Sequence, residues 1–319
     1  MRAFVFPGQG AQAIGMGRAL AEAYPAARAV FDEVDDVLGE RLSALIWEGE
    51  AETLTLTRNA QPALMATSMA AFRALEAEGA GIEAASFVAG HSLGEYSALC
   101  AAGALSLGDT ARLLRIRGDA MQAAVPEGEG AMAAIVGLDF ETVAKIVADA
   151  SEAGAVCEAA NDNDPTQVVI SGHKAAVERA MELCKEGGAR RALPLPVSAP
   201  FHSSLMSPAA ERMAAALAEV TLNAPAVPVV ANVTARPVSD PAEIRELLVA
   251  QVTGSVRWRE SVAWMAEAGV TESWEIGSGR ALTGMIRRIA KEMETRTIGT
   301  PEEAAAAAQS LTEKGTADV

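Results

Sequence analysis

The stretch VAGHSLGEYSALCAAG, residues 88–103, places Ser92 between Gly90 and Gly94. The apolar residues at its start predict a buried strand, and those after Gly94 recur at helical spacing. A turn that tight between strand and helix requires glycines on both sides, and it would lift the serine oxygen above the end of a sheet. Because an ordinary strand–helix loop can also contain a serine, the motif alone is a weak signal. A nucleophilic serine further requires a base, oxyanion donors and a substrate pocket.

Bulk composition narrows the class of protein. The chain has 319 residues, half of them hydrophobic, which suits one large domain or one domain with an insertion. The net charge of −16 argues against nucleic acid or an anionic membrane as a partner. No apolar run is long enough to span a membrane, and too few apolar residues precede Pro7 for a signal peptide. We therefore expect a soluble, cytoplasmic protein.

The three cysteines, Cys100, Cys157 and Cys184, lie far apart and form no CxxC pair. They cannot make a disulfide framework. We expect them to be small buried hydrophobic residues in a reducing compartment.

Helical and strand patterns alternate from residue 3 to about residue 122, which is typical of an α/β layer fold. The segment VPEGEG, residues 125–130, then interrupts the chain. The pattern that follows has the order βαββαβ over about 70 residues, which indicates a ferredoxin-like unit. Its predicted elements are a strand at 131–138, a helix at 140–150, strands at 155–160 and 167–171, a helix at 175–185 and a strand at 192–197.

The alternation of helices and strands resumes after this unit. We therefore infer a large α/β domain interrupted by a small insert, and expect the Ala-rich tail after Thr300 to be a surface helix that frays. The predicted elements of the second half are helices at 208–220, 244–251, 261–268 and 281–291 and strands at 227–231 and 273–276.

Only three histidines can supply a base. His91 adjoins Ser92, and adjacent side chains in a sharp turn diverge. His173 opens the second helix of the insert, where we expect a solvated first-turn residue. His202 lies in PVSAPFHSSLM, where the insert returns to the large domain, and is the predicted base. No carboxylate is near it in sequence, so either a distant aspartate or a backbone carbonyl could orient the ring.

The oxyanion requires fixed N–H donors. The amide of Leu93 is the first candidate, because it follows the serine. The loop FPGQGAQ, residues 6–12, offers the amide of Gln9 as the second. The same glycines also fit a loose dinucleotide fingerprint, but that motif requires a second strand ending in an acidic residue about 20 positions on. Residues 18–38 predict a helix instead.

Arg117 is the predicted anchor for a negatively charged substrate. Leu113, Leu114 and Met121 lie three or four residues from it and share its apolar face. A guanidinium on an inner face either forms a structural ion pair or binds a substrate carboxylate with two parallel hydrogen bonds.

Six motifs occur in order across about residues 1–290: FPGQGAQ, GHSLGEYSAL, RIRG, GAMAAI, PLPVSAPFHSSLM and SVRW. Together they resemble the malonyl-CoA:acyl carrier protein transacylases of fatty acid synthesis. The resemblance implies an α/β-hydrolase-like large domain (1–126 and 199–300), a ferredoxin-like insert (127–198) and a C-terminal tail (301–319).

The resemblance also assigns roles. It makes Ser92 the nucleophile, His202 its base, Arg117 the malonyl anchor, and the amides of Gln9 and Leu93 the oxyanion donors. It places the main-chain carbonyl of Gln251 against the histidine ring, so that Ser92 and His202 form a dyad. The other implied substrate-binding residues are His91, Met121, Asn163 and Phe201. Some members carry a small serine where this chain has Phe201, so a pocket closed to α-branched acyl groups is expected.

The implied reaction takes malonyl from malonyl-CoA to the phosphopantetheine thiol of acyl carrier protein, with CoA as product. No metal and no tightly bound cofactor is expected, and the chain is expected to be a monomer. Since the carrier is acidic too, docking requires a local basic patch. Candidates are Arg190 and Arg191 on the insert and Arg287, Arg288 and Lys291 on one face of the last helix of the large domain. The alternative is an ordinary solvated surface with helix ion pairs to Glu292 and Glu294.

Two other functional classes remain open at this point. One is a serine hydrolase or thioesterase on the same scaffold, which would release free malonate without a carrier. The other is a non-catalytic carrier-binding protein, which the combination of Ser92, His202 and Arg117 argues against.

Overall fold

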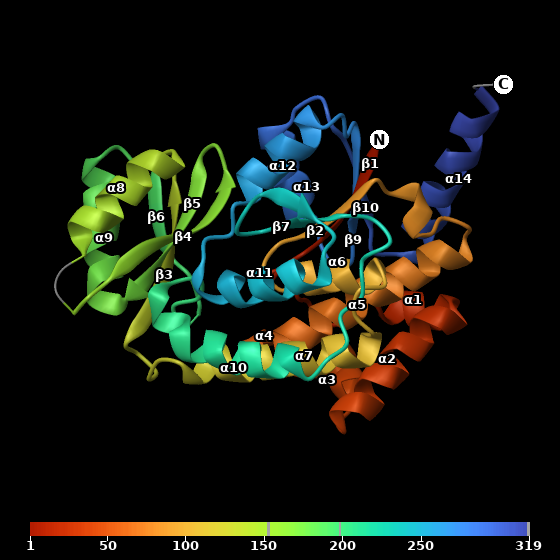
Figure 1. Cartoon of the computed structure of the whole chain (residues 1–319), viewed down its shortest axis with the longest axis horizontal. Coiled ribbons are helices and arrows are strands. Elements are labelled where there is room, and N and C mark those ends of the chain that lie inside the picture. Colours follow the sequence, from red (N-terminus) through yellow and green to blue (C-terminus); the bar gives the residue numbers. More distant parts are fainter. Residues whose placement is uncertain (152–153, 198, 318–319) are drawn as a thin grey trace.

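The computed structural model describes residues 1–151, 154–197 and 199–317, and in the last helix it describes side chains as far as residue 311. The chain forms two lobes, which lie beside one another in Figure 1. Within the described residues, a six-stranded sheet forms the base of the large lobe and a four-stranded sheet that of the small lobe. The fold is therefore α/β, as the sequence predicts.

The sheet of the large lobe has the strand order β10-β9-β1-β2-β7-β8. Neighbouring strands are parallel except for β8, which pairs antiparallel with β7 at one edge. The carboxyl ends of β1, β2 and β7 therefore meet at the same edge of the sheet. The strands are β1 (Arg2–Phe6), β2 (Phe87–Gly90), β7 (Val229–Ala231), β8 (Arg236–Val238), β9 (Glu272–Ile276) and β10 (Glu294–Ile298).

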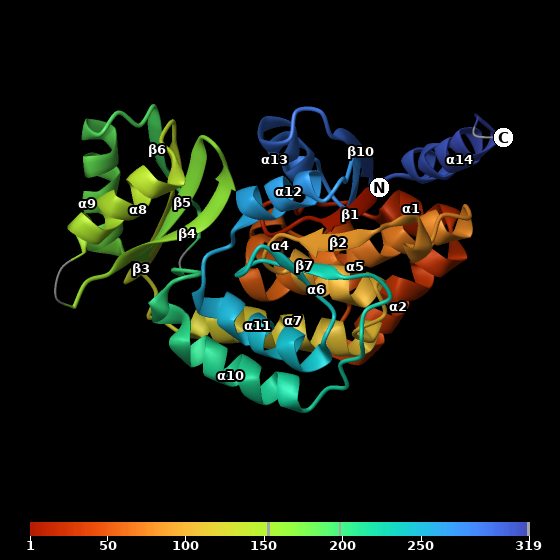
Figure 2. The same ribbon diagram turned by 45° about the horizontal axis from the view of Figure 1, so that its top comes forward.

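Helices cover both faces of this sheet (Figure 2). Side chains of β1 alternate, so Phe4 and Phe6 pack into the larger core while Ala3 and Val5 pack into a second core on the opposite face. The helices are α1 (Arg18–Ala23), α2 (Pro25–Leu38), α3 (Leu42–Glu48), α4 (Ala51–Thr55), α5 (Thr57–Ala77), α6 (Gly94–Ala101), α7 (Leu107–Ala123), α10 (Ser207–Ala218), α11 (Pro241–Thr253), α12 (Trp258–Glu267), α13 (Ala281–Ile289) and α14 (Pro301–Ala317), with 3₁₀ turns at Ile82–Ala84 and Ser204–Met206.

The small lobe has the chain order βαββαβ that the sequence predicts. Its strands are in the order β4-β5-β3-β6, and all neighbours are antiparallel. β4 extends four residues beyond the predicted end of its strand. The predicted strand at 192–197 ends early, and residue 198 lies outside the described residues. The elements are β3 (Gly130–Val136), α8 (Phe140–Ala150), β4 (Cys157–Asp164), β5 (Gln167–His173), α9 (Lys174–Glu186) and β6 (Arg191–Pro194).

Two predictions about the C-terminal part are wrong. α13 ends at Ile289, so Lys291 lies beyond the helix and shares no helical face with Arg287. The tail forms α14, but Ala304 and Ala307 are buried, and the helix contacts α5 and β10. Alanine at helical spacing allows this close packing, so the start of α14 belongs to the core rather than to the surface. Residues 318–319 of the tail lie outside the described residues.

Among the remaining predictions about single residues and segments, the one for His173 is wrong and the others below agree with the structure. His173 is partly buried, and its Nδ1 accepts a hydrogen bond from the N–H of Val156 at 3.0 Å, so the expectation of a solvated residue is wrong. Residues 18–38 are helical, which removes the second strand that dinucleotide binding would require. All three cysteines are free and buried, as predicted. Among the described residues, no helix is long and apolar enough to cross a membrane.

Candidate active site

The turn between β2 and α6 holds Ser92 in a left-handed backbone conformation, with φ of 54°. A Cβ on Gly90 would lie 1.9 Å from the carbonyl of Gly94, and a Cβ on Gly94 would lie 2.2 Å from the carbonyl oxygen of Phe6. No side chain fits at either position, because these distances are far below van der Waals contact. The two glycines therefore permit the strained turn that presents Ser92 at the carboxyl ends of β1 and β2.

Asn232 supports this turn from the end of β7. Its Oδ1 accepts a hydrogen bond from the N–H of Ser92 at 2.8 Å, and its Nδ2 donates to the carbonyl of Gly90 at 2.7 Å. The side chain is buried. Sequence reasoning missed Asn232, although a polar residue directly after a buried strand in VVAN was a usable signal.

His202 completes a hydrogen-bonded pair with Ser92. The Nε2 atom of His202 lies 2.7 Å from Ser92 Oγ, and its Nδ1 lies 2.9 Å from the main-chain carbonyl oxygen of Gln251. A carbonyl can only accept, so Nδ1 carries the proton and Nε2 is free to accept one from the serine. The question that the sequence left open, carboxylate or carbonyl, is answered by the geometry in favour of the carbonyl.

The environment of His202 keeps the ring neutral. Burial and the neighbouring charge of Arg117 lower the pKa of His202 from 6.5 to about 3. The imidazole is therefore unprotonated at Nε2 throughout the neutral range. Burial also lowers the pKa of His91, whose Nε2 lies 2.8 Å from Asn163 Oδ1.

Arg117 is 1% exposed and lies on α7. It donates to Gln61 Oε1 at 2.7 Å, to Ser92 Oγ at 3.1 Å and to Gln251 Oε1 at 2.9 Å. None of the ion pairs found among the described residues involves Arg117. The alternative role of Arg117, a structural ion pair, therefore does not agree with the structure. Three of its five N–H groups are used by neutral acceptors, which leaves hydrogen-bonding capacity for an anion.

A buried carboxyl group, Glu95, lies behind the pair. Its Oε2 accepts hydrogen bonds from Gln251 Nε2 at 2.8 Å and from the N–H of Asn232 at 3.1 Å. Burial raises the pKa of Glu95 to about 7, although the hydrogen bonds and the charge of Arg117 oppose the rise. Glu95 is not among the predicted site residues, because nothing in the local sequence GEYSAL indicates that this glutamate is buried.

A cavity of about 340 Å³ lies over Ser92 and is lined from both lobes. The structure brings most of the predicted site residues to it, while Gln251 contacts the ring of His202 from outside the lining. The amides of Gln9 and Leu93 have no acceptor in the part of the chain that the structure describes. The predicted residues that line the cavity are Gln9, His91, Ser92, Leu93, Arg117, Met121, Asn163, Phe201 and His202.

The predicted docking residues lie away from this cavity. Arg190 and Arg191 are exposed on the small lobe. Arg287 donates from Nε to Thr295 Oγ1 at 2.9 Å, and Arg288 forms an ion pair with Asp164 at 2.8 Å. The structure therefore does not bring the five residues together as one free patch. Within the described residues, no group of three or more His, Cys, Asp and Glu side chains is arranged to hold a metal ion.

The fold and the site together define a class of protein. A serine hydroxyl on a strained turn, a neutral imidazole and a buried, unpaired guanidinium converge at the carboxyl ends of parallel strands, and these are the groups that acyl transfer requires. Residues 3–308 match the acyl transferase domain family. The chain belongs to this family and is an acyltransferase.

Known proteins of the family resemble the chain over nearly its whole length. It is 48% identical over 312 residues to the malonyl CoA-acyl carrier protein transacylase of Bacillus subtilis strain 168, which covers 98% of each chain. The crystal structure of an acyl-carrier-protein-S-malonyltransferase from Bartonella henselae superposes with a TM-score of 0.95 at 58% identity, covering 98% of this chain and 99% of that one. A malonyl-transacylase solved in complex with a type II PKS acyl-carrier protein has a TM-score of 0.93 at 44% identity, with 97% and 99% covered.

Proposed function

We propose that the protein transfers the malonyl group from malonyl-CoA to the phosphopantetheine thiol of acyl carrier protein, through a malonyl ester on Ser92. It thereby supplies malonyl units for fatty acid synthesis. The observation that carries the proposal is that one atom, Ser92 Oγ, lies 2.7 Å from His202 Nε2 and 3.1 Å from a nitrogen of Arg117. A nucleophile, its base and a cationic anchor thus meet at one point.

The reaction follows a ping-pong course. His202 takes the proton of Ser92 as its oxygen attacks the thioester carbonyl, and the amides of Gln9 and Leu93 hold the oxyanion. His202 then gives the proton to the sulfur of CoA, which leaves as the C–S bond breaks. The carrier thiol enters, loses its proton to His202 and takes the malonyl group, and Ser92 regains its proton. The steps need no metal and no bound cofactor.

The chemistry of the cavity favours malonyl as the acyl group. The guanidinium of Arg117 pairs with the free carboxylate of malonyl, because a buried charge without an ionic partner gains most from one. Phe201, which is 9% exposed and lines the cavity, restricts room beside the α-carbon and so favours malonyl over methylmalonyl.

The architecture supports a finer description of the fold. The parallel sheet with a serine on the turn after β2 is α/β-hydrolase-like, and the strand order of the small lobe is that of a ferredoxin-like unit. We place the large domain at 1–126 and 199–300, the insert at 127–198 and the tail at 301–319. We also propose a monomer that acts in the cytoplasm.

Separate measurement of the two half-reactions tests the function. Protein labelled with malonyl at Ser92 is expected to keep the label in buffer and to lose it rapidly to holo acyl carrier protein, since a transferase must favour the thiol over water. The masses of protein and carrier follow both steps. Rapid release of free malonate in the absence of carrier would instead support the thioesterase alternative.

The pH dependence of acylation tests the state of His202. In the Glu95→Gln variant, which removes a carboxyl group titrating at about pH 7, the rate of Ser92 acylation is expected to stay flat from pH 8 to about pH 5. The reason is that the pKa of His202 is lowered to about 3, so the neutral base persists as pH falls. A loss of rate centred near 6.5 in this variant would show that the ring titrates normally and contradict the assignment.

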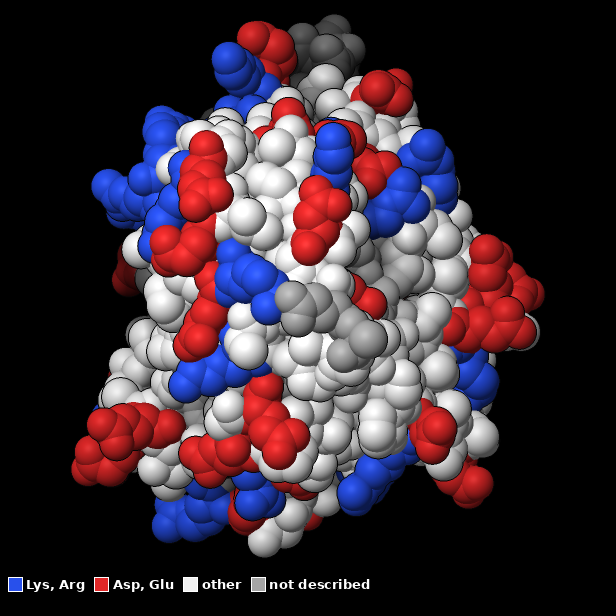
Figure 3. Space-filling model, turned by 90° about the vertical axis from the view of Figure 1, so that its left-hand side faces the viewer, with Lys and Arg blue, Asp and Glu red and all other residues white. Residues whose placement is uncertain are grey.

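The proposed carrier-docking residues differ from those that the sequence suggests, because Arg288 is paired with Asp164 and Lys291 lies beyond α13. Figure 3 shows acidic and basic side chains interspersed over the face that carries the small lobe. Arg287 shares a surface cleft with Arg280 and Arg296, so we propose this cleft, together with Arg190 and Arg191, as the docking contact. Arg288 is not a suitable test of docking, because its reversal to glutamate would repel Asp164.

Charge reversal tests this contact. Arg287→Glu combined with Arg191→Glu is expected to raise the KM for carrier several-fold and to leave acylation by malonyl-CoA unchanged, because exposed charges steer a charged partner without touching the cavity. Added salt should weaken the wild-type carrier reaction more than that of the variant. Arg212→Glu on α10 combined with Arg41→Glu before α3, two further exposed arginines, is the matched control with the same change in charge. Equal KM values for variant and control would refute the docking contact.

A further inference from the structure

The end of β4 alternates amides with carboxylates: Asn161, Asp162, Asn163 and Asp164. Successive side chains of a strand point to opposite sides. Asn161 and Asn163 line the cavity, and Asn163 Oδ1 lies 2.8 Å from His91 Nε2. Asp162 and Asp164 are 0% and 1% exposed and do not line it. Two buried carboxylates thus alternate along β4 with two amides that line the cavity.

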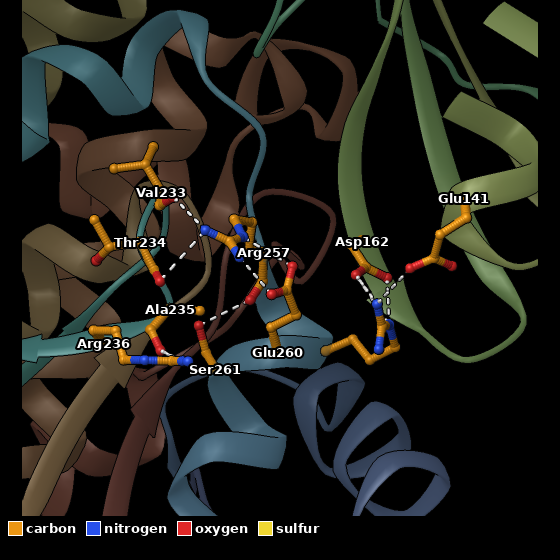
Figure 4. Close-up of polar contacts among 10 residues, drawn as sticks. Glu141, Asp162, Val233, Thr234, Ala235, Arg236, Arg257, Glu260 and Ser261 are labelled. Atoms are coloured by element: carbon orange, nitrogen blue, oxygen red, sulfur yellow. Dashed lines mark hydrogen bonds and ion pairs between the residues drawn. The ribbon is translucent and has the colours of Figure 1, made fainter. Parts of the chain in front are cut away.

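Each carboxylate pairs with an arginine of the other lobe. Both carboxylate oxygens of Asp162 accept a hydrogen bond from Arg259 Nε at 3.0 Å, and Oδ2 also lies 2.9 Å from Arg259 Nη2. Asp164 lies 2.8 Å from Arg288 Nε. Figure 4 shows Asp162 and Glu141 both projecting from the small lobe toward the same position beside α12, and Glu141 lies 3.8 Å from Arg259. These ion pairs join β4 to α12 and α13.

The backbones of the two lobes also pair beside these ion pairs. β4 is an edge strand of its sheet, and its outer edge pairs with the segment before α12. The N–H of Asp162 donates to the carbonyl of Val256 at 2.9 Å, and the N–H of Val256 donates to the carbonyl of Ala160 at 2.8 Å. The ion pair between Asp162 and Arg259 adds a contact that a slip of β4 by one register step would break, because such a slip turns every side chain to the other face.

The same segment reaches the nucleophile from its other side. The N–H of Arg257 donates to the carbonyl of Asn232 at 3.0 Å, and the guanidinium donates to the carbonyl of Val233 at 3.2 Å (Figure 4). Asn232 holds the N–H of Ser92. Residues 256–259 therefore connect the support of the nucleophile with the strand that forms the opposite wall of the cavity.

We propose that Arg259, with Arg288 as a second contact, is a positioning residue for the acyl pocket. Its pairing with Asp162 fixes β4 so that Asn163 holds His91 and the cavity wall in place around the malonyl group. Without the guanidinium, a buried carboxylate is left uncompensated and the strand shifts to hydrate it. The inference rests on the proposed malonyl transfer, but it concerns binding of the acyl group and not the chemistry at Ser92.

Single-turnover labelling of Ser92 separates binding from chemistry. Arg259→Gln and Arg288→Gln are each expected to raise the malonyl-CoA concentration for half-maximal rate about 5- to 10-fold, with the maximal rate changed less than about twofold. Arg259→Lys should recover most of the loss. The matched control is Arg2→Gln, which removes a partly buried ion pair with Glu272 at 2.7 Å in the large sheet. It should lower the melting temperature and leave the half-maximal concentration unchanged.

Two further readouts make the test decisive. Asn163→Ala should reproduce the effect of Arg259→Gln, and the double variant should add little, because both act through one strand. Amide exchange at Asp162, measured without substrate, should quicken in Arg259→Gln but not in Arg2→Gln. Additive effects, or an unchanged half-maximal concentration with unaltered exchange, would overturn the inference. A wild-type protein that takes up no malonyl group would refute the proposed function. The exchange measurement, which is made without substrate, would still test whether Arg259 fixes β4.

Discussion

Exposure of the Ser92→Ala variant to malonyl-CoA is expected to add no malonyl group to the protein, whereas the wild type gains one. The variant keeps the turn between β2 and α6, since the backbone of this turn is held by Gly90, Gly94 and Asn232 rather than by the hydroxyl of Ser92. What it loses is the oxygen that contacts both His202 and Arg117. Transfer to the carrier should therefore fall to the uncatalysed level. Intact mass and peptide mapping measure the label.

The matched control is Ser97→Ala. Ser97 is a buried serine on α6, the helix that follows Ser92, and its hydroxyl has no partner among the described residues. Its loss should leave labelling intact. Cys100 on the same helix is a competing nucleophile by residue type, but burial raises the pKa of its thiol to about 11, so it remains protonated. A label on Cys100 or on any residue other than Ser92 would reject the assignment of the nucleophile.

The elements that sequence predicts well are those with a local physical cause. Gly90 and Gly94 predict the tight turn around Ser92, because no side chain fits at either position. Apolar periodicity gives the helix at 140–150 with the same bounds as α8. The order βαββαβ of the insert follows from the same patterns, and three histidines are few enough that position alone singles out His202.

Long-range contacts are what the sequence hides. Asn232 lies 140 positions from Ser92 and is not predicted, and Gln251 lies 159 positions away and is predicted only from the family resemblance. Nothing in their local sequence says that β7 neighbours β2 or that α11 ends beside the histidine. Glu95 is similarly invisible, because a glutamate in the first turn of a helix is normally exposed. The boundaries at α13 and α14 failed for a related reason: helix ends and the burial of alanine depend on tertiary packing.

The Arg117→Ala variant is expected to change acyl selectivity. Removing the guanidinium leaves the malonyl carboxylate unpaired in a buried cavity, at a cost of about 2–5 kcal/mol, which corresponds to about 30-fold to several thousand-fold in the acylation of Ser92 by malonyl-CoA. Acetyl-CoA has no carboxylate, so it loses only what Arg117 contributes through Ser92, Gln251 and His202. The ratio of the malonyl to the acetyl rate should therefore fall steeply, as competition between the two substrates and mass analysis of labelled Ser92 would show.

The ratio, rather than either rate, is the measure that isolates the carboxylate. Arg117 also contacts Gln251 and lowers the pKa of His202, so its loss disturbs the base as well as the anchor. Measurement at pH 8 keeps the imidazole neutral in both proteins, and both substrates share any remaining defect in the nucleophile. Arg112→Ala, a half-exposed arginine paired with Asp109 on the same helix, is the matched control. Equal losses for malonyl-CoA and acetyl-CoA in a folded Arg117→Ala protein would mean that the guanidinium serves only to hold Ser92 and Gln251, and that malonyl is recognised elsewhere.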